Sequence, residues 1–332
     1  MYAALQPLLL RLDPERAHAL TLDLLRIAHR LGLLRRSAAS GSPVHLMGLD
    51  FASRVGLAAG FDKNGVCVDA LGALGFGFVE VGTVTPQPQA GNPRPRVFRL
   101  RAARAVVNRM GFPNEGVAAL VARLRARRFR GICGVNIGKN AATPLDAAAA
   151  DYAACLRAVY PHADYVALNI SSPNTAGLRE LQSESRLAPL LDSLLELRGL
   201  LAAEHGRHVP LLVKLSPDLT DDELAATAGV IAALGIEGVI ATNTTLRRPG
   251  VEGLPGAGEA GGLSGAPLYE LSLGVVRRLR AALGARTVII GVGGIDSAAA
   301  ARKMLAAGAD LVQIYTGLVY EGPRLVRELA RL

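Results

Sequence analysis

From residue 53 onward, short apolar runs alternate with longer amphipathic stretches, and this alternation constrains the fold more than any other feature of the chain. The runs are short and largely apolar, as expected for strands buried on both faces. Thr220 and Ser297 are typical residues for starting the helices between them. Eight such units predict an α/β fold, a closed (β/α)8 (TIM) barrel, with a doubly wound sheet as the alternative. The expected strands cover 53–58, 78–83, 132–137, 164–169, 210–215, 237–242, 287–292 and 310–315, and the expected helices include 115–128, 184–204, 220–234, 267–284 and 296–306.

Two long segments interrupt the alternation at the expected rim of the barrel. Residues 84–108 are too long for a simple connection and carry two short apolar runs, 97–100 and 105–107. We expect a small antiparallel flap there. Residues 246–264 are rich in glycine and proline and predict another long loop, of the kind that is often functional in compact domains.

The first 40 residues stand apart from the barrel pattern. A helix start is predicted at Asp13-Pro14-Glu15, which supplies an N-cap, a proline at the first helical position and an acid in the first turn. Apolar residues share one face of this helix, and a second apolar patch lies at 5–10. Two such helices with basic flanks fit a membrane interface, or they cap the open N-terminal end of the barrel. We therefore divide the chain into an N-terminal helical extension, 1–40, and a barrel domain, 41–332.

The composition narrows the range of partners. The net charge of +9 favours anionic partners, among them a phosphate cofactor, an acidic substrate or an anionic membrane surface. The basic residues form no long tract and tryptophan is absent, which argues against nucleic acid. The sequence predicts no signal peptide or membrane span, and its three cysteines form no C-x-x-C pair, so we expect reduced thiols in a cytosolic protein. No cluster of histidines and cysteines predicts a metal site.

The ends of the expected strands are unusually polar. Active sites of (β/α)8 barrels lie at the C-terminal ends of the strands, and here those ends carry asparagines, threonines and lysines. A single asparagine or threonine there is an ordinary turn residue, but six polar strand ends converging on one rim predict a site. Only four lysines occur among the 37 basic residues, and Lys63 and Lys214 are two of them. A lysine retained where arginine otherwise prevails indicates a site that needs a compact ammonium group.

Glycine-rich loops follow the last two expected strands, at 291–296 and 315–317. Barrels often bind phosphate at this position, because glycine lets the backbone approach the phosphate oxygens; tight turns are the alternative explanation. A phosphate site beside a rim of amides and one lysine predicts FMN. Lys214 then lies at the pyrimidine edge of the flavin and stabilises its reduced, anionic form, and Lys63 holds a substrate carboxylate.

At these positions the chain resembles the class 2, quinone-linked dihydroorotate dehydrogenases. The motifs appear in family order and cover essentially the whole chain. They are LDPERAH (12–18), GLAAGFDKNG (56–65), EVGTVTPQPQ (80–89), PRVFRL (95–100), NRMGF (108–112), NIGKN (136–140), NISSPNT (169–175), ATNTT (241–245), GGLSG (261–265), GVGGID (291–296) and QIYTG (313–317).

The resemblance implies oxidation of (S)-dihydroorotate to orotate, with one FMN per chain and a membrane quinone as final acceptor. This reaction belongs to de novo pyrimidine (UMP) biosynthesis, and the implied location is peripheral, on the cytoplasmic face of the cell inner membrane. Ser172 is implied as the catalytic base that takes the C5 proton while C6 delivers hydride to the flavin. The N-terminal helices would form a quinone tunnel.

The resemblance also implies a set of binding residues. The FMN contacts are Ala59, Gly60, Thr83, Asn136, Asn169, Lys214, Thr242, Gly265, Gly294, Tyr315 and Thr316. The substrate contacts are Lys63, Asn108, Arg109, Met110, Gly111, Phe112, Asn169, Asn174, Asn243 and Thr244. The quinone-site candidates are His18, Arg99 and Tyr315.

The serine at 172 distinguishes the classes of the family. In the soluble class 1 relatives the base is a cysteine on a barrel loop, whereas the nearest cysteine here, Cys155, lies 17 residues upstream in an expected helix. A serine hydroxyl is a weak base and needs a relay, which the sequence does not identify. Pro113 after the NRMGF motif is a local departure from the family pattern.

Two other functions remain as alternatives at this stage. One is a soluble FMN barrel oxidoreductase that acts on another pyrimidine-like substrate. The other is a non-catalytic barrel that binds a phosphate ligand. The sequence leaves open which quinone is used and whether the chain works as a monomer.

Overall fold

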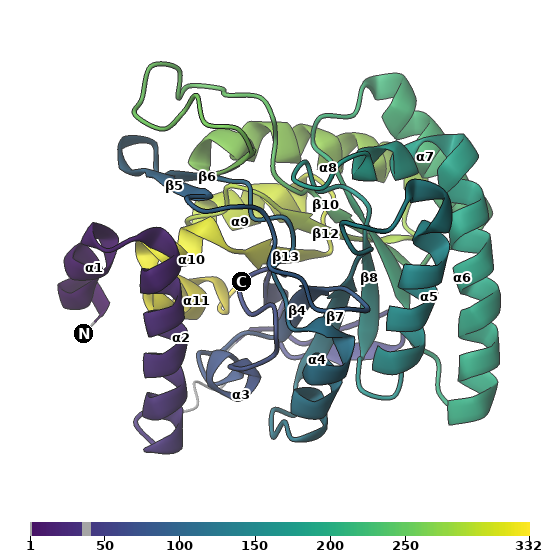
Figure 1. Cartoon of the computed structure of the whole chain (residues 1–332), viewed down its shortest axis with the longest axis horizontal. Helices are drawn as coiled ribbons and strands as arrows, with labels where there is room; N and C mark the ends of the chain where they lie inside the picture. Colours follow the sequence, from purple (N-terminus) through teal and green to yellow (C-terminus); the bar gives the residue numbers. More distant parts are fainter. Residues whose placement is uncertain (1, 35–40) are drawn as a thin grey trace.

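Eight parallel strands close into a barrel in this computed structural model, which describes residues 2–34 and 41–332 (Figure 1). Each strand pairs in parallel with its sequence neighbour, and the last pairs with the first, with Val312 opposite Val55. Closure confirms the (β/α)8 prediction and rules out the doubly wound sheet. The barrel strands are β3 (Val55–Leu57), β4 (Phe78–Val84), β7 (Ile132–Ile137), β8 (Tyr165–Asn169), β9 (Leu211–Leu215), β10 (Gly238–Ala241), β12 (Val288–Val292) and β13 (Leu311–Ile314).

Helices surround the barrel, and two of them begin at the N-caps that the sequence predicts. Thr220 forms a capping box with Glu223, and the Ser297 hydroxyl accepts from the Ala300 N–H, so both predicted starts are confirmed. The helices of the barrel domain are α3 (Val68–Gly72), α4 (Gly116–Arg125), α5 (Ala148–Val159), α6 (Glu184–His205), α7 (Asp221–Ala233), α8 (Tyr269–Leu283), α9 (Ala298–Ala306), α10 (Thr316–Glu321) and α11 (Pro323–Leu329).

The N-terminal end of the barrel is closed by a hairpin of β1 (Val44–Leu46) and β2 (Leu49–Phe51). Phe51 is fully buried and meets the ring of Phe78 edge-on at 5.2 Å between centroids. Large apolar side chains fill the interior above it. Because this end is closed and apolar, the polar strand ends are left facing the opposite rim.

The N-terminal helices are α1 (Tyr2–Arg11) and α2 (Pro14–Arg30), at the left of Figure 1. Asp13 caps α2 by accepting from the N–H groups of Glu15 and Arg16, as predicted. Helix α2 packs against α3 and β5 instead of the barrel's N-terminal end, so the capping alternative is wrong. The segment boundary predicted at residue 40 lies outside the described residues. The described helices include none that is long and apolar enough to cross a membrane.

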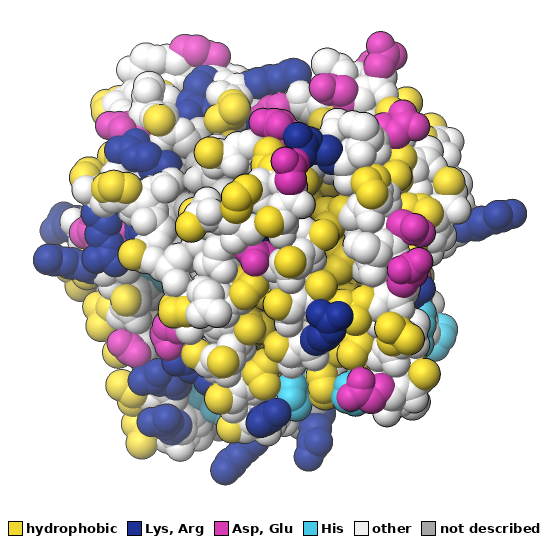
Figure 2. All heavy atoms as spheres, turned by 45° about the vertical axis from the view of Figure 1, so that its right-hand side comes forward, with side chains coloured by type: hydrophobic (Ala, Val, Ile, Leu, Met, Phe, Trp, Pro, Cys, Tyr) yellow, Lys and Arg dark blue, Asp and Glu magenta, His cyan; other side chains and the backbone are white. Residues whose placement is uncertain are grey.

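The predicted flap is present and has one strand more than expected. Strands β5 (Val97–Leu100) and β6 (Ala105–Asn108) form the antiparallel pair, and β11 (Gly262–Gly265) adds to β6. The end of the segment predicted as a loop is therefore a strand. Its sequence, GLSG, has little intrinsic strand preference, so pairing with β6 determines its conformation. On the face drawn in Figure 2, lysines and arginines are scattered among acidic and apolar side chains.

Candidate functional site

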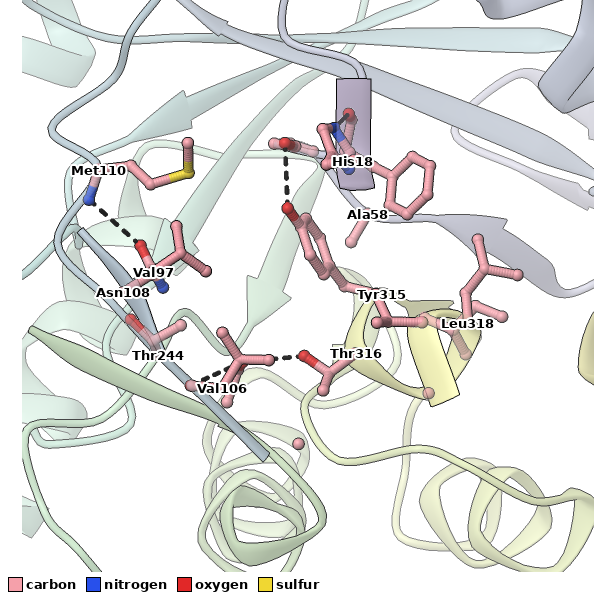
Figure 3. A pocket seen from close by; sticks show the side chains of 18 of the residues that line it. His18, Ala58, Val97, Val106, Asn108, Met110, Thr244, Tyr315, Thr316 and Leu318 are labelled. Atoms are coloured by element: carbon pink, nitrogen blue, oxygen red, sulfur yellow. Dashed lines mark hydrogen bonds between the residues drawn. The ribbon is translucent and has the colours of Figure 1, made fainter. Parts of the chain in front are cut away.

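A cavity of about 470 Å³ opens at the C-terminal rim of the barrel and extends to the N-terminal helices. Its volume lies within the roughly 300–1,000 Å³ typical of small-molecule and cofactor sites. Figure 3 shows His18, Tyr315 and Thr316 along one side, with Asn108 and Thr244 across from them. One continuous space therefore joins the polar strand ends to the helices α1 and α2.

A network of buried amides and hydroxyls joins four strand ends. The Thr83 hydroxyl donates to Asn136 Oδ1 at 2.5 Å, and Asn169 Nδ2 donates to Thr83 Oγ1 at 2.8 Å. Asn243 Nδ2 donates to Asn169 Oδ1 at 3.2 Å. Thr83, Asn169 and Asn243 line the cavity, whereas Asn136 lies behind them and is fully buried. The site predicted from converging strand ends is thus assembled, with Asn136 as a support within it.

Beneath this network lies a buried acid, Glu80 on β4, which the sequence analysis did not select. Its carboxylate accepts from Asn136 Nδ2 at 2.9 Å, from the Tyr165 hydroxyl at 2.8 Å and from Gln313 Nε2 at 2.8 Å. The sequence does contain a signal that could have identified Glu80: it is the one acid in the apolar run 78–84. A charged group in a fully buried strand needs hydrogen-bonding partners. Gln313, which was also missed, lines the cavity.

The two lysines singled out by the sequence both line the cavity. Among the described residues none forms a hydrogen bond or ion pair with the Lys214 ammonium. Burial lowers the pKa of Lys214, and the negative charge of Glu80 opposes that effect. Lys63 Nζ donates to the Gly60 carbonyl at 2.6 Å, and burial lowers its pKa to about 8, opposed by Glu15. Both cations therefore face the cavity in surroundings that favour a negative ligand group.

Three side chains that line the cavity carry a buried polar atom without a partner among the described residues. Gln313 Oε1, Asn174 Oδ1 and Thr244 Oγ1 are buried without a hydrogen bond among the described residues, and all three side chains line the cavity. Leaving such a group unpaired costs about 1–3 kcal/mol. Three of them around one cavity indicate a ligand with complementary donors and acceptors.

The glycine loops predicted to bind phosphate form another part of the cavity wall. Gly293 and Gly294 adopt φ values of 130° and 71°, which favour glycine. Thr316 begins α10 beside them, and its hydroxyl lies 2.8 Å from the Ser264 hydroxyl of β11. The tight turn is therefore real, and it lies where a phosphate group could approach the backbone.

The expected substrate residues come together beneath the flap, with one exception. Asn174 Nδ2 donates to Asn108 Oδ1 at 3.2 Å, and the Asn174 N–H donates to the Ser172 hydroxyl at 3.2 Å. Arg109 does not line the cavity: its guanidinium pairs with Glu259 at 2.7 Å and lies over the Phe98 ring. Its guanidinium is therefore held outside the cavity, and the substrate contact expected for Arg109 stays a prediction. Arg109 ties the flap to the 246–264 segment.

The quinone-site candidates line the end of the cavity near the helices. His18 Nε2 lies 2.7 Å from the Phe61 carbonyl, and burial lowers the pKa of His18 to about 4. The ring is therefore neutral at pH 7, and its Nε2–H donates to that carbonyl. Tyr315 donates to the Gly60 carbonyl at 3.3 Å. Arg99 Nη1 donates to the Leu12 carbonyl at 2.8 Å, which links the flap to the end of α1.

Most of the remaining residues that the sequence predicts for the site also line the cavity. The residues lining the cavity also include Ala59, Gly60, Met110, Gly111, Phe112, Thr242 and Gly265. Cys155 is buried on α5, as expected, and burial raises the pKa of its thiol. Within the described residues, no group of three or more His, Cys, Asp or Glu side chains could hold a metal ion.

Comparisons with known proteins agree with this geometry. The family model described as "Dihydroorotate dehydrogenase" matches residues 43–331. Proteins named dihydroorotate dehydrogenase (quinone) from Azotobacter vinelandii and Methylococcus capsulatus are each 56% identical over 330 residues. These alignments cover 99% of this chain in both cases, and 95% and 97% of the two relatives.

Solved structures support the same assignment. A crystal structure of DHODH from Eimeria tenella in complex with ferulenol has a TM-score of 0.87 and 36% sequence identity. It matches 96% of this chain and 90% of its own length. A ligand-free DHODH structure from the same organism has a TM-score of 0.87 and 38% identity, over 96% of this chain and 93% of that one. From its barrel, its cavity and these matches, the chain belongs to the dihydroorotate dehydrogenase family.

Proposed function

We propose that this chain is a quinone-dependent dihydroorotate dehydrogenase, which oxidises (S)-dihydroorotate to orotate in UMP biosynthesis. The observation that carries the proposal is one cavity that joins a rim of amides and lysines to side chains of the two N-terminal helices. The relatives reported above carry the quinone-dependent name. They do not favour the alternative of a soluble oxidoreductase with another pyrimidine-like substrate.

The family uses a flavin, and we infer that here it is one FMN per chain. Gln313 and Lys214 offer an acceptor and a cation, as the pyrimidine edge of a flavin requires, and the loop around Gly294 suits a phosphate. When bound, the flavin would take two electrons from the substrate and pass them to the quinone. The residues proposed to hold it are Ala59, Gly60, Thr83, Asn136, Asn169, Lys214, Thr242, Gly265, Gly294, Tyr315 and Thr316.

Lys63 would hold the substrate carboxylate, because it supplies an ammonium group to the cavity in addition to that of Lys214. The other side chains around it offer neutral donors and acceptors that match a dihydropyrimidine ring. The proposed substrate contacts are Lys63, Asn108, Arg109, Met110, Gly111, Phe112, Asn169, Asn174, Asn243 and Thr244. The guanidinium of Arg109 binds Glu259 outside the cavity, so its place in this set rests on the 108–112 motif.

Ser172 would remove the C5 proton of the substrate. Its side chain is buried, and its oxygen accepts a hydrogen bond from the Asn174 N–H, which stabilises negative charge developing there. The hydroxyl must in turn release its own proton. Thr175 offers a relay: its hydroxyl lies three residues further along the same loop and is buried without a partner among the described residues.

A quinone would enter between α1 and α2, past His18, Arg99 and Tyr315. These helices expose large apolar side chains and carry arginines, which fits peripheral binding to an anionic membrane on its cytoplasmic face. The most exposed apolar side chains of this region are Leu5, Leu8, Leu12, Leu20, Leu24, Ile27, Leu31 and Leu33.

The proposal is tested by the cofactor and the electron acceptor together. The cofactor released from purified protein should have the mass of FMN, at one per chain. With dihydroorotate as donor, a short-chain ubiquinone analogue should be reduced at least ten times faster than fumarate or NAD⁺. A different cofactor, or fumarate or NAD⁺ as the faster acceptor, would contradict the assignment.

A further inference from the structure

We propose that Glu80 is a positioning residue for the flavin, because it fixes Gln313 with its amide oxygen toward the cavity as an acceptor for the imide N–H of the pyrimidine ring. This inference rests on the proposed FMN site. It gives a role to two residues, on β4 and β13, that begin the motifs at 80–89 and 313–317 but are absent from the binding residues that the resemblance implies.

The first support is the position of Glu80 inside the barrel. The residue is fully buried, yet both of its carboxylate oxygens are used. Oε1 accepts from Asn136, and Oε2 accepts from Tyr165 and Gln313. These three donors come from β7, β8 and β13, so the carboxylate is held from several sides. A buried acid of this kind is costly unless it is paired in this way.

The second support is the orientation that Glu80 imposes on the Gln313 amide. Gln313 Nε2 donates to Glu80 Oε2 at 2.8 Å, so the nitrogen of this amide is turned toward the carboxylate. The same nitrogen lies 3.4 Å from the Tyr165 hydroxyl oxygen, which also accepts because its own proton goes to Glu80. The opposite end of the amide, Oε1, is therefore fixed as an acceptor.

The third support is the lack of a partner for that oxygen. Gln313 Oε1 is buried without a hydrogen bond to any described residue, and Gln313 lines the cavity. The ligand that pairs with it must bring an N–H donor. The imide N–H of a flavin is such a donor, next to oxygens that suit the cation of Lys214. Glu80 is also the acid that opposes loss of the Lys214 proton, so one carboxylate supports both groups.

The test compares FMN binding to apoprotein across a double-mutant cycle. Glu80→Gln allows the Gln313 amide to rotate, and Gln313→Met removes its oxygen at similar volume. Each should weaken FMN about tenfold, as for the loss of one hydrogen bond to a ligand. Glu80→Gln should cost less in the Gln313→Met background than in the wild type, because part of the effect of Glu80 acts through Gln313. Tyr165→Phe, which keeps the carboxylate and its bond to Gln313, is the matched control and should change affinity little.

A second readout separates positioning from a general structural role. In ¹⁵N-labelled FMN, the imide N–H proton should be shifted downfield in the wild-type complex and in Tyr165→Phe. It should lose that shift in Glu80→Gln and Gln313→Met. If Glu80→Gln does not fold, Gln313→Met decides alone, with the same two measurements.

Unchanged affinity and an unchanged imide resonance in Gln313→Met would overturn the inference while leaving FMN binding intact. Additive losses in the double variant would overturn the action of Glu80 through Gln313. Wild-type apoprotein that takes up no FMN would overturn the proposed function, and this inference with it.

Discussion

The two ends of the cavity differ in polarity and in exposure to solvent. The barrel end is formed by residues at the strand ends, and the helix end is formed by α1 and α2. At the barrel end, polar side chains are fixed by strand pairing and buried, as for Ser172 at 4% exposure and Lys214 at 6%. At the helix end, apolar side chains remain open to solvent, with Leu8 at 59% and Leu31 at 67%. Catalysis requires reacting groups that are held in place, whereas binding of an apolar acceptor requires only an accessible apolar surface.

A small set of polar contacts links the two ends. Arg96 Nη2 donates to Glu15 of α2 at 2.9 Å, and its Nη1 donates to the Asn92 carbonyl at 2.8 Å. Asn92 Nδ2 in turn donates to the Asn174 carbonyl at 3.1 Å, beside the proposed base. A chain of hydrogen bonds through Arg96 and Asn92 therefore connects helix α2 with the loop that carries Asn174.

The largest expected effect is at the barrel end. Ser172→Ala should retain FMN and lose about 100- to 10,000-fold in the rate of flavin reduction by dihydroorotate, the range for removal of a general base. Stopped-flow absorbance measures this rate. Ser171→Ala is the neighbouring control, since the Ser171 hydroxyl is already bonded to Asn243 and should matter less. Near-normal reduction in Ser172→Ala would refute the base assignment.

The helix end should be separable from the barrel end. Deleting residues 1–40 should bring quinone reduction to background while reduction of the flavin by dihydroorotate stays measurable, because the rim of the barrel remains. Steady-state assays with a quinone analogue and anaerobic mixing with substrate give the two rates. Quinone turnover that survives the deletion would show that the tunnel assignment is wrong.

The affinity of the barrel end for orotate should depend on pH because of Lys63. Its pKa is lowered from 10.5 to about 8, so the ammonium is present below pH 8 and is lost as pH rises through that value. Orotate affinity, followed by the perturbed flavin spectrum, should therefore fall about tenfold per pH unit above pH 8. Lys63→Arg keeps its charge throughout and should bind with little pH dependence. Wild-type affinity that stays constant to pH 10 would contradict a carboxylate contact made by a Lys63 ammonium of lowered pKa.

Membrane binding should depend on the helix end alone. Leu8→Asp with Leu24→Asp should weaken binding to vesicles containing phosphatidylserine by at least about tenfold, because two apolar side chains leave the lipid. Flotation assays measure the bound fraction. Leu200→Asp, on α6 and 71% exposed, is the matched control and should bind as the wild type does. Equal losses in both proteins would point to a general surface effect.

The smallest effect tests the link between the ends. Glu15 opposes the lowering of the Lys63 pKa, so Glu15→Gln should move the fall in orotate affinity to a lower pH. Titration of the orotate-induced spectral change gives its midpoint. Asp23→Asn, which removes an exposed acid from the same helix, should leave that midpoint in place. Identical midpoints in all three proteins would mean that the two ends act independently.

The sequence predicted the barrel well because buried parallel strands are continuous apolar runs, and helix caps such as Thr220 have local signals. It missed β11 because only pairing with β6 makes residues 262–265 a strand. It missed Glu80 because one acid in an apolar run shows no partners until the barrel closes. It did not show that the Arg109 guanidinium binds Glu259, because a motif specifies a residue but not the direction of its side chain.

Anaerobic addition of dihydroorotate to the purified protein tests the central claim most directly, with the visible absorption band of the flavin as the readout. We expect rapid bleaching of that band, with full colour returning on addition of a quinone. A yellow protein that stays yellow with dihydroorotate would contradict the substrate assignment.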